Sequence, residues 1–526
     1  MNRRGSGPYG LPSRVMKSPV ALALAVIAAL AWAGPANAAK TCAEPGAGAA
    51  GWKRATPAEA GMDAAKLQDA VDYATTELST AVRVYRHGCL VAADRQEALT
   101  QQYRSESWSL AKSITSLVFG RAMTLGLISP DDPVGSLVVE ADQAHGAITA
   151  RHLLTMTSGL RWNGFRDYNI VMKDRLRDFL TVDVVHPPGS WYEYSQTGPF
   201  TLAEAVSRAV GEDFQAFAQR ELFGPIGIKP GTWSWRRDGM NRTQGFFGVQ
   251  MTADDYGRLG DLMRRGGVWD GKRLLSKRYL REALTPTRTN GCYGWLIWLN
   301  AAKPCITPTV SERPVNDRQN FPGLPADLYR FSGLFGQLVS TFPTQDLVVV
   351  RTGQESDAIN FSGGAGYEDT LYRKVLGAIT DGEVAFDEDV PAVPGDAGQE
   401  NPDKGFQYSF AETDESGAPF GSSPPPPAGP FRQRALVLRA GRSKDRVVRV
   451  RATCPARASR ACTGTASLVG AKRDLSYDIA EGATHSLRFV LERLPRRVKS
   501  IRATTVNIGD GGGTPAYLRI KVRPAR

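Results

Sequence analysis

The chain has few of the residues that build metal centres or membrane spans. Its 526 residues contain 6 Cys and 5 His, with no Cys-x-x-Cys pair, and only His87 lies near a cysteine, Cys89, at ligand spacing. A metal site is therefore not expected, and neither is a cofactor. No apolar run after residue 38 reaches 18 residues, which argues against a transmembrane helix. No tryptophan follows Trp298, so the last part of the chain lacks indole platforms for stacking bases or sugars, and nucleic-acid binding is not expected.

The first 38 residues have the composition of a leader. They carry four basic residues and no acidic one, then an apolar run over 20–33, and end in the small-residue sequence Ala36-Asn37-Ala38. This order is typical of a cleaved secretory signal peptide. Residues 1–38 are therefore predicted to be a signal peptide, and the mature protein is predicted to be secreted, either extracellular or associated with the cell wall.

The formal charge of +12 is unevenly distributed along the chain. Residues 39–380 contribute +2, residues 381–429 contribute −10, and residues 430–526 contribute +16. The basic segment 430–526 could bind an anionic cell-wall polymer such as teichoic acid through counterion release. The alternative is an arginine-rich, solubilised surface whose charge the preceding acidic segment partly neutralises.

Export to an oxidising compartment favours disulfides among the six cysteines. Three bridges can pair in 15 ways, and the simplest hypothesis joins neighbours along the chain: Cys42 with Cys89, Cys292 with Cys305, and Cys454 with Cys462.

The order of periodic segments predicts an α+β fold. A helix and a strand pair come first, many helices follow, and several strands with a closing helix end the segment 39–380. This order indicates one antiparallel sheet that is completed late in the chain. Helical patterns cover 56–76, 107–126, 149–157, 201–221, 252–265, 276–284 and 368–380, and strand patterns cover 81–85, 293–299, 336–342 and 346–352.

The chain changes character after residue 380. Residues 381–429 are acidic and contain four consecutive prolines at 424–427, which predicts an extended, semi-rigid linker. Short alternating segments over 430–526 predict a small all-β sandwich. The expected organisation is therefore a signal peptide (1–38), an α+β domain (39–380), an acidic Pro-rich linker (381–429) and a basic β-sandwich module (430–526).

The candidate catalytic residues lie at the start of the helix predicted for 107–126. Ser109 and Lys112 are three residues apart, so they are neighbours on one helix face. Serine is a weak nucleophile without a base, and lysine acts as a base only where burial or a nearby cation lowers its pKa. Trp108 and the apolar helix face offer such burial. One Ser-x-x-Lys is expected by chance in a chain of this composition, so a solvent-facing pair remains the alternative from this motif alone.

Several further segments occur in a fixed order around this pair. Together they resemble the serine β-lactamase-related family, which includes class C β-lactamases, D-Ala-D-Ala peptidases, esterases and 6-aminohexanoate-dimer hydrolases. The resemblance covers roughly residues 55–380 and implies an antiparallel sheet flanked by helices with a helical subdomain. The segments are Ser109–Ser116, Ile148–Leu160, Pro188–Ser195, Phe223–Ile228, Met251–Asp255, and Gly336-Gln337 followed by Asp346–Arg351.

The resemblance also implies roles for individual residues. Ser109 matches the family's acylated serine, Lys112 its general base, and Tyr194 the tyrosine that relays the proton to the leaving group. The expected oxyanion hole consists of the backbone N–H of Ser109 and of a residue near Leu334, since backbone donors suffice for it. The expected substrate contacts come from Gln196, Phe335 and Trp108.

Two departures from the family pattern bear on the substrate. The second motif usually ends in Asn but here ends in Gln196, and the third motif, Lys-Thr-Gly or a His-x-Gly version, is absent. The stretch Ser332–Gln337 occupies its place. Losing the cation and hydroxyl that bind a substrate carboxylate makes penicillin and D-Ala-D-Ala less favoured, and apolar Leu334 and Phe335 favour a less charged small-molecule ester or amide.

Three alternatives remain from the sequence. One is β-lactam or D-Ala-D-Ala chemistry, and another is a catalytically silent binding protein at the cell surface. The third, a Ser-His-Asp triad, is weaker, because Gly-x-Ser-x-Gly is missing. Ser105, Ser107 and Ser113 remain substitute nucleophiles. His152 is expected to be structural, and no carboxylate partner is suggested by spacing for the other histidines.

Overall fold

The computed structural model describes most of the region predicted to be the hydrolase and seven strands of the C-terminal region. The predicted signal peptide, most of the predicted linker and Cys454 of the third predicted disulfide lie outside the described residues. The described residues are 39–47, 51–76, 79–162, 164–307, 314–353, 366–384, 386, 389–395, 437–444, 447–453, 462–468, 475–480, 483–490, 499–506 and 515–520.

A six-stranded sheet forms the centre of the predicted hydrolase region. Its strand order is β2-β1-β13-β12-β11-β8, and every neighbouring pair is antiparallel. The first two strands come from the start of the domain and the others from its end, which confirms the predicted sheet completed late in the chain. The strands are β1 (Ser79–Arg86), β2 (Cys89–Ala93), β8 (Trp298–Leu299), β11 (Tyr329–Gly333), β12 (Gln337–Phe342) and β13 (Leu347–Gly353).

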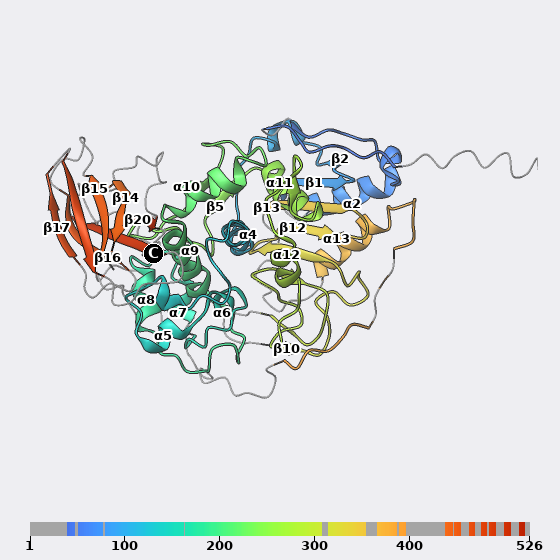
Figure 1. Ribbon diagram of the computed structural model, residues 1–526. Helices are drawn as coiled ribbons and strands as arrows, with labels where there is room; N and C mark the ends of the chain where they lie inside the picture. The colour runs from blue at the N-terminus through green and yellow to red at the C-terminus, as the bar shows by residue number, and fades with distance from the viewer. Residues whose placement is uncertain are drawn as a thin grey trace, which may run out of the picture. The chain divides into compact units, whose positions relative to one another are not determined.

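Helices cover both faces of this sheet (Figure 1). Helices α2 (Ala64–Thr76) and α13 (Gly366–Leu376) bury apolar side chains against one face, where Val84 and Val349 point. Helices α4 (Leu110–Thr124) and α11 (Ala253–Arg264) pack on the other face. At Gly260 of α11, an added Cβ would lie 2.7 Å from methyl groups of Val339 and Val348, so glycine lets α11 approach the sheet closely.

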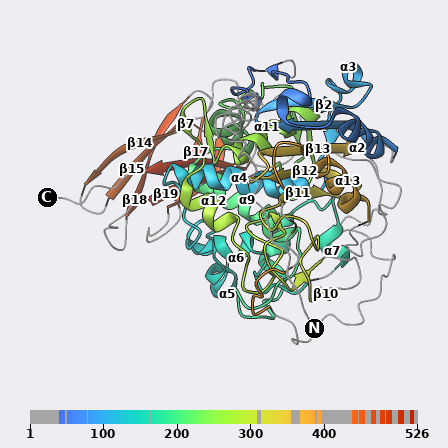
Figure 2. The same ribbon diagram turned by 90° about the vertical axis from the view of Figure 1, so that its right-hand side faces the viewer.

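Shorter helices form a second layer beyond α4, seen in blue-green in Figures 1 and 2. Several of these helices start with a side-chain cap, for example Thr149 on the His152 N–H and Asp213 on the Ala216 N–H, as expected for Thr and Asp at helix N-caps. The remaining helices are α3 (Glu97–Thr100), α5 (Gln143–Ala147), α6 (Ala150–Leu154), α7 (Gly164–Tyr168), α8 (Arg175–Thr181), α9 (Thr197–Val210), α10 (Phe214–Ala218) and α12 (Lys277–Ala283).

The small strands of this region pair outside the central sheet. β3 and β4 flank β5, and β6–β7 and β9–β10 are separate hairpin-like pairs. They are β3 (Ser105–Glu106), β4 (Ser234–Trp235), β5 (Val249–Met251), β6 (Val268–Trp269), β7 (Lys272–Arg273), β9 (Cys305–Ile306) and β10 (Val315–Asn316).

Three boundaries differ from the sequence prediction. The predicted helix 56–76 begins as a 3₁₀ turn at Ala58–Ala60, and its α-helix starts at Ala64. The predicted helix 201–221 is divided because Gly211 adopts a left-handed conformation, with φ of 79°, that ends α9. The predicted strand 293–299 was wrong for most of its length, since only Trp298–Leu299 pairs in the sheet.

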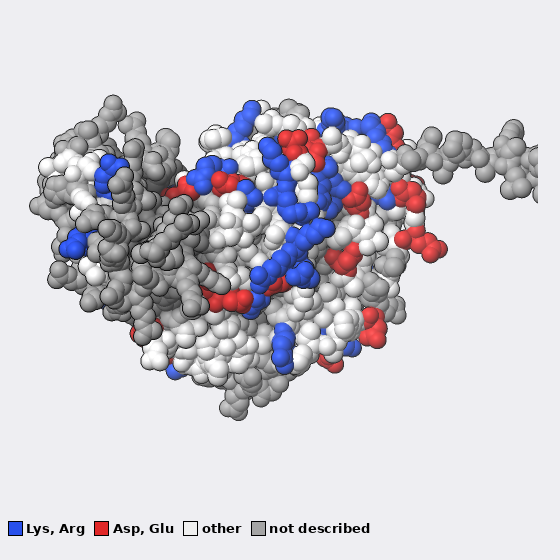
Figure 3. All heavy atoms as spheres, viewed as in Figure 1, with Lys and Arg blue, Asp and Glu red and all other residues white. Residues whose placement is uncertain are grey.

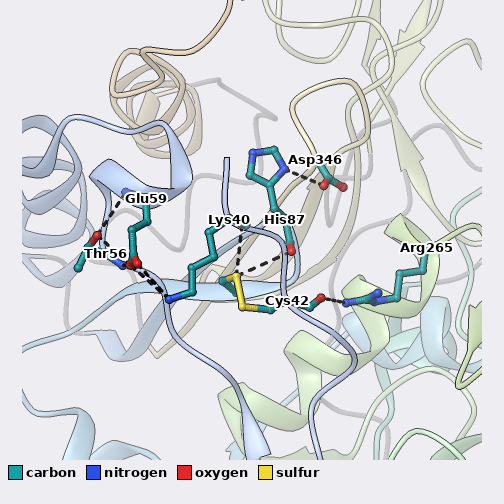
Figure 4. The surroundings of a disulfide bond; sticks show 8 residues. Lys40, Cys42, Thr56, Glu59, His87, Arg265 and Asp346 are labelled. Carbon is teal, nitrogen blue, oxygen red and sulfur yellow. Dashed lines mark hydrogen bonds and ion pairs between the residues drawn. A yellow bond between two sulfur atoms is a disulfide. The ribbon is translucent and has the colours of Figure 1, made fainter. Parts of the chain in front are cut away.

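Two of the predicted disulfides are present. Cys42 is bonded to Cys89, and Cys292 to Cys305. The first bridge joins the segment before the sheet to the start of β2, and the Cys42 carbonyl accepts a hydrogen bond from Arg265, the residue that follows the last residue of α11 (Figure 4). The bridge therefore fastens the beginning of the described chain to the sheet and to α11.

The C-terminal strands form two antiparallel sheets, β14-β15-β18 and β17-β16-β19-β20. Buried Val450, Leu487 and Phe489 lie among them. Two sheets of short strands agree with the predicted small all-β module. The strands are β14 (Val437–Lys444), β15 (Val447–Thr453), β16 (Cys462–Leu468), β17 (Leu475–Ile479), β18 (Thr484–Val490), β19 (Lys499–Val506) and β20 (Pro515–Ile520).

Both acidic and basic side chains lie on the described surface in Figure 3. A band of Lys and Arg crosses the middle of that face, where Figure 1 places α12. Exposed Lys277, Arg278 and Arg281 belong to this helix. None of the helices in the described part of the chain is long and apolar enough to cross a membrane.

Candidate active site

Ser109 lies at the N-cap of α4, in the middle of the domain between the sheet and the second helical layer. Nearly all side chains of α4 are buried, from Leu110 to Ala122. Ser109 itself is half-buried, so its hydroxyl remains accessible. The helix start leaves backbone N–H groups near this hydroxyl, and such groups favour negative charge.

Lys112 is buried beneath Ser109 with only 1% of its surface exposed. Its Nζ lies 2.9 Å from Ser109 Oγ and 3.3 Å from the Phe246 carbonyl oxygen. Burial lowers the pKa of Lys112 to about 7, a change that the charge of Arg175 reinforces and that of Asp167 opposes. The amine is therefore substantially neutral near pH 7 and able to accept a proton from the hydroxyl that it contacts.

Tyr194 completes the group of three. It is 7% exposed, and Lys112 Nζ lies 4.7 Å from the centre of its ring. Burial raises the pKa of Tyr194, while its hydrogen bond with Ser109 lowers it. The phenol is therefore neutral at physiological pH and carries a transferable proton. The ring stacks on Trp298 at a centroid distance of 5.9 Å, which fixes its plane. The three predicted catalytic residues are thus brought together.

The turn before Ser109 is unusual because Trp108 has a positive φ of 47°. Residues with a side chain rarely adopt this conformation. Glu106 Oε1 holds the turn by accepting the backbone N–H of Trp108 at 3.3 Å and of Gly248 at 2.8 Å. The Trp108 ring meets the Phe335 ring edge-on, with centroids 5.3 Å apart. These two predicted substrate-contact residues lie side by side.

The end of β11 lies directly against the turn that carries Ser109. A Cβ added at Gly333 would lie 2.1 Å from the Ser107 carbonyl oxygen and 3.0 Å from the Leu110 nitrogen. Only glycine permits this approach, and it brings the backbone of Leu334 beside the start of α4. Sequence reasoning missed the role of Gly333, although its place after Ser332, where the third motif would stand, was a usable signal.

The residues after Gly333 are fixed by hydrogen bonds to their carbonyl groups. Phe335 has a positive φ of 64°, and its carbonyl accepts Arg351 Nη1 at 2.9 Å. The Gln337 side chain donates to the Leu334 carbonyl at 3.3 Å. Leu334 and Phe335 remain half-buried, so a substrate can reach this edge.

Gln196 forms the N-cap of α9 and is 3% exposed. Its backbone N–H donates to both oxygens of Asp167, at 3.0 and 2.9 Å. Among the described residues, the Lys112 amine donates to Ser109 and Phe246 and not to the Gln196 amide. Gln196 therefore lies beside the site, and the side chain that replaces the family's Asn makes no hydrogen bond to the lysine.

The substitute nucleophiles have structural hydrogen bonds. Ser113 donates to the Leu296 carbonyl at 2.6 Å, and Ser107 donates to the Trp108 carbonyl at 3.1 Å. Ser105 shares a hydrogen bond of 2.9 Å with Thr80. All three serines are buried, which argues against each of them as the attacking group.

Two histidines have carboxylate partners in the structure, although the sequence analysis identified none for them. His87 Nδ1 lies 2.9 Å from Asp346 Oδ2 (Figure 4) and His145 Nδ1 lies 2.8 Å from Asp142 Oδ1. His145 also uses its second ring nitrogen on a backbone carbonyl. His152 accepts the Thr149 N–H in a capping box, so it is structural as predicted.

Across the described residues, no group of three or more His, Cys, Asp or Glu side chains is placed to hold a metal ion.

The sequence model of the Beta-lactamase family matches residues 66–359, more than half of the chain. None of the curated proteins matches this chain. The solved structures to which the chain is similar include the following three. A proposed 6-aminohexanoate-dimer hydrolase from Bacillus anthracis has 15% identity and a TM-score of 0.48, covering 64% of this chain and 90% of that chain. EstCE1, a hydrolase with promiscuous acyltransferase activity, has 17% identity and a TM-score of 0.44, and the match covers 59% of this chain and 98% of EstCE1. A penicillin-binding protein homologue from Caulobacter crescentus has 15% identity and a TM-score of 0.45, and the match covers 60% of this chain and 99% of that chain.

Proposed function

Because the chain belongs to the beta-lactamase family of serine hydrolases, we propose that it hydrolyses an ester or amide through an acyl-enzyme on Ser109. The observation that carries the proposal is the contact of 2.9 Å between Lys112 Nζ and Ser109 Oγ, at a lysine whose pKa burial lowers to about 7. A solvent-facing Ser-x-x-Lys pair would lack the lowered pKa, because an exposed amine stays protonated at neutral pH.

In the proposed acylation, neutral Lys112 takes the proton of the Ser109 hydroxyl while Oγ attacks the substrate carbonyl carbon. The negative charge that develops on the carbonyl oxygen is stabilised by the backbone N–H groups of Ser109 and Leu334, since fixed donors in a dry site oppose charge build-up. The close approach of Gly333 to the start of α4 supports this pairing of donors.

Collapse of the tetrahedral intermediate breaks the bond to the alcohol or amine. Tyr194 gives its proton to this leaving group and is reprotonated from Lys112, which received the proton of Ser109. Its hydrogen bond with Ser109 and its raised pKa support the role of a neutral donor. Water then attacks the acyl ester by the reverse path, the acid leaves, and Ser109 regains its proton.

The residues around Ser109 favour an uncharged acyl group. Trp108, Leu334 and Phe335 are half-buried and lie at the edge of the site. The stretch Ser332–Gln337, which contains no Lys, Arg or His, stands where the family's third motif would supply a cation. An apolar ester or amide is therefore favoured over a penicillin or a D-Ala-D-Ala peptide, whose carboxylate needs a positive partner.

A fluorophosphonate probe tests the nucleophile. The probe is expected to label the wild-type protein on Ser109, located by mass spectrometry of the digest, and Ser109→Ala is expected to remain unlabelled and to lose p-nitrophenyl butyrate hydrolysis. Ser113→Ala is the matched control and should keep both. An adduct on another residue, or equal hydrolysis by Ser109→Ala, would refute the mechanism. Labelling of Ser109 by a fluorescent penicillin would assign β-lactam chemistry instead.

We also propose that the protein is exported and cut after Ala38. The two disulfides support an oxidising destination, and N-terminal sequencing of the mature protein tests the cut.

If segment 430–526 retains the enzyme on an anionic cell-wall polymer, its deletion will release the enzyme from walls at low salt and make no difference at high salt. Equal retention of both forms would leave only a solubilising role.

A further inference from the structure

A buried carboxylate at α7 faces the candidate active site without belonging to any motif of the sequence. Asp167 is 5% exposed and follows Arg166 in a helix of five residues. Its two oxygens accept the Gln196 N–H at 3.0 and 2.9 Å, and one of them accepts the Thr197 N–H at 3.4 Å. The carboxylate therefore binds the free end of α9 from another element.

This contact supplies what the start of α9 lacks locally. Gln196 is the N-cap residue, but its side chain makes no capping hydrogen bond. The Gly198 N–H donates to the Ser195 hydroxyl at 3.1 Å, which leaves the first two N–H groups to Asp167. An anion at a helix N-terminus satisfies such groups and interacts favourably with the helix dipole.

The same segment carries the tyrosine of the site. Tyr194 precedes Gln196 by two residues, and its ring lies over the Lys112 amine at 4.7 Å. A displacement of the α9 start therefore moves the Tyr194 hydroxyl relative to Ser109. Displacements of about 1 Å can reduce a catalytic rate by about 100-fold.

The charges around Asp167 come from every element packed against it. Arg175 and Asp178 approach from α8, and Lys112 from α4. Arg175 Nη1 donates to the Thr197 hydroxyl at 3.3 Å, and that hydroxyl donates to Asp178 at 2.9 Å. Asp238 and Arg166 act on Arg175 in turn. Within this group, Asp167 raises the pKa of Lys112 and Arg175 lowers it.

We propose that Asp167 is a positioning residue of the hydrolytic site, which holds Tyr194 in place through the N-terminus of α9 and supplies the negative charge that faces Lys112. The proposal rests on the proposed function, in which neutral Lys112 and the Tyr194 hydroxyl act on Ser109. Two substitutions separate the positioning effect from the charge effect. Asp167→Asn keeps an acceptor for the backbone N–H groups but loses the charge, whereas Asp167→Ala loses both.

The test measures kcat/KM of p-nitrophenyl butyrate hydrolysis against pH for the full-length wild type, Asp167→Asn, Asp167→Ala and the control Asp178→Asn. Asp178 is a buried carboxylate of the same cluster that bonds the Thr197 side chain rather than the backbone. Asp167→Asn is expected to keep the plateau within about threefold and to move the acidic limb down by up to about one pH unit, because it removes the charge that favours protonated Lys112. That charge is present in the wild type above the pKa of Asp167, which burial raises to about 6. Asp167→Ala is expected to lower the plateau by about 100-fold.

The outcomes are distinct. A limb that moves for Asp167→Asn and stays for Asp178→Asn supports the proposal, and this shift is not produced by a merely structural residue. A limb and plateau identical to wild type in Asp167→Asn and Asp167→Ala would overturn it while leaving the proposed function intact. A wild-type enzyme without hydrolysis or Ser109 labelling would instead refute the proposed function. If Asp167→Ala does not fold, as judged by circular dichroism, the limb of the near-isosteric Asp167→Asn decides alone.

Discussion

The protonation of Lys112 gives the sharpest prediction for the hydrolytic activity. An exposed lysine has a pKa of 10.5, whereas burial lowers that of Lys112 to about 7. At pH 7 the neutral fraction therefore rises from about 0.03% to about one half, which is roughly a thousandfold gain in available base. Because the neutral amine is the active form, kcat/KM is expected to rise with pH through an acidic limb near 7. At pH 5 it should be about 100-fold below the plateau.

Replacement of Lys112 by Arg tests the same reasoning. A guanidinium stays charged across the accessible pH range, so Lys112→Arg is expected to lose about 10³-fold in kcat/KM at every pH. Lys66→Arg on α2 is the matched control, because Lys66 is exposed, and it should retain wild-type activity. The assay is initial-rate hydrolysis of p-nitrophenyl butyrate from pH 5 to 9, corrected with Ser109→Ala for spontaneous hydrolysis.

Stability separates loss of chemistry from loss of fold. The pKa of Lys112 is lower in the folded than in the unfolded chain, so the unfolded state binds more protons between pH 7 and 10.5. Stability should therefore rise with pH over this window. At pH 7, the lower end of this window, Lys112→Met removes the cost of burying the amine and is expected to raise the free energy of unfolding by about 2 kcal/mol while abolishing activity. For activity, three results would refute the role of neutral Lys112: a kcat/KM that does not change with pH in the wild type, an acidic limb of kcat/KM near pH 10, or an active Lys112→Arg.

Three further changes have defined outcomes. Tyr194→Phe removes the proton donor and should lower kcat about 100-fold with little change in thermal midpoint, read from rates and calorimetry, and an unchanged kcat would exclude the relay. Gly333→Ala places a Cβ 2.1 Å from a backbone oxygen, so it should cost about 3 kcal/mol in denaturant unfolding and also reduce activity, whereas a wild-type value would contradict the close approach. Replacing both cysteines of the Cys42–Cys89 bridge opens a loop with a sequence separation of 47 and should cost about 4 kcal/mol. The Cys292–Cys305 pair, with a separation of 13, should cost about 3 kcal/mol by the same unfolding assay, and a reversed order would reject the loop-entropy explanation.

The fold was largely predictable because its periodic segments are long. The β-branched run of β13 and the apolar faces of α4 and α11 read as sheet and helix without tertiary information. β11 escaped prediction because Tyr329–Gly333 is only five residues long and includes Arg330. The strand predicted for 293–299 failed for the opposite reason, since its apolar residues are buried in a loop, where Leu296 has a positive φ of 56°. These residues are apolar because they are buried, as the residues of a central strand are, but they do not form the hydrogen bonds of a strand.

The candidate site was predictable only where its geometry is local. Ser109 and Lys112 lie on one helix, so a spacing of three residues places their side chains together whatever surrounds them. The carbonyl that receives the second Lys112 hydrogen bond belongs to Phe246, 134 residues later. No spacing rule connects such segments, because their meeting depends on how the chain between them folds.

The charge state of the predicted base is set by the same distant elements. Burial favours the neutral amine, Arg175 adds to that effect, and Asp167 opposes it. Both charged residues stand in the second helical layer, on α8 and α7. A serine and a lysine three residues apart on an exposed helix would lack this balance, and the amine would remain protonated at neutral pH. The Ser-x-x-Lys spacing therefore brings the two groups together, while the helices packed over α4 decide whether the lysine can act as a base.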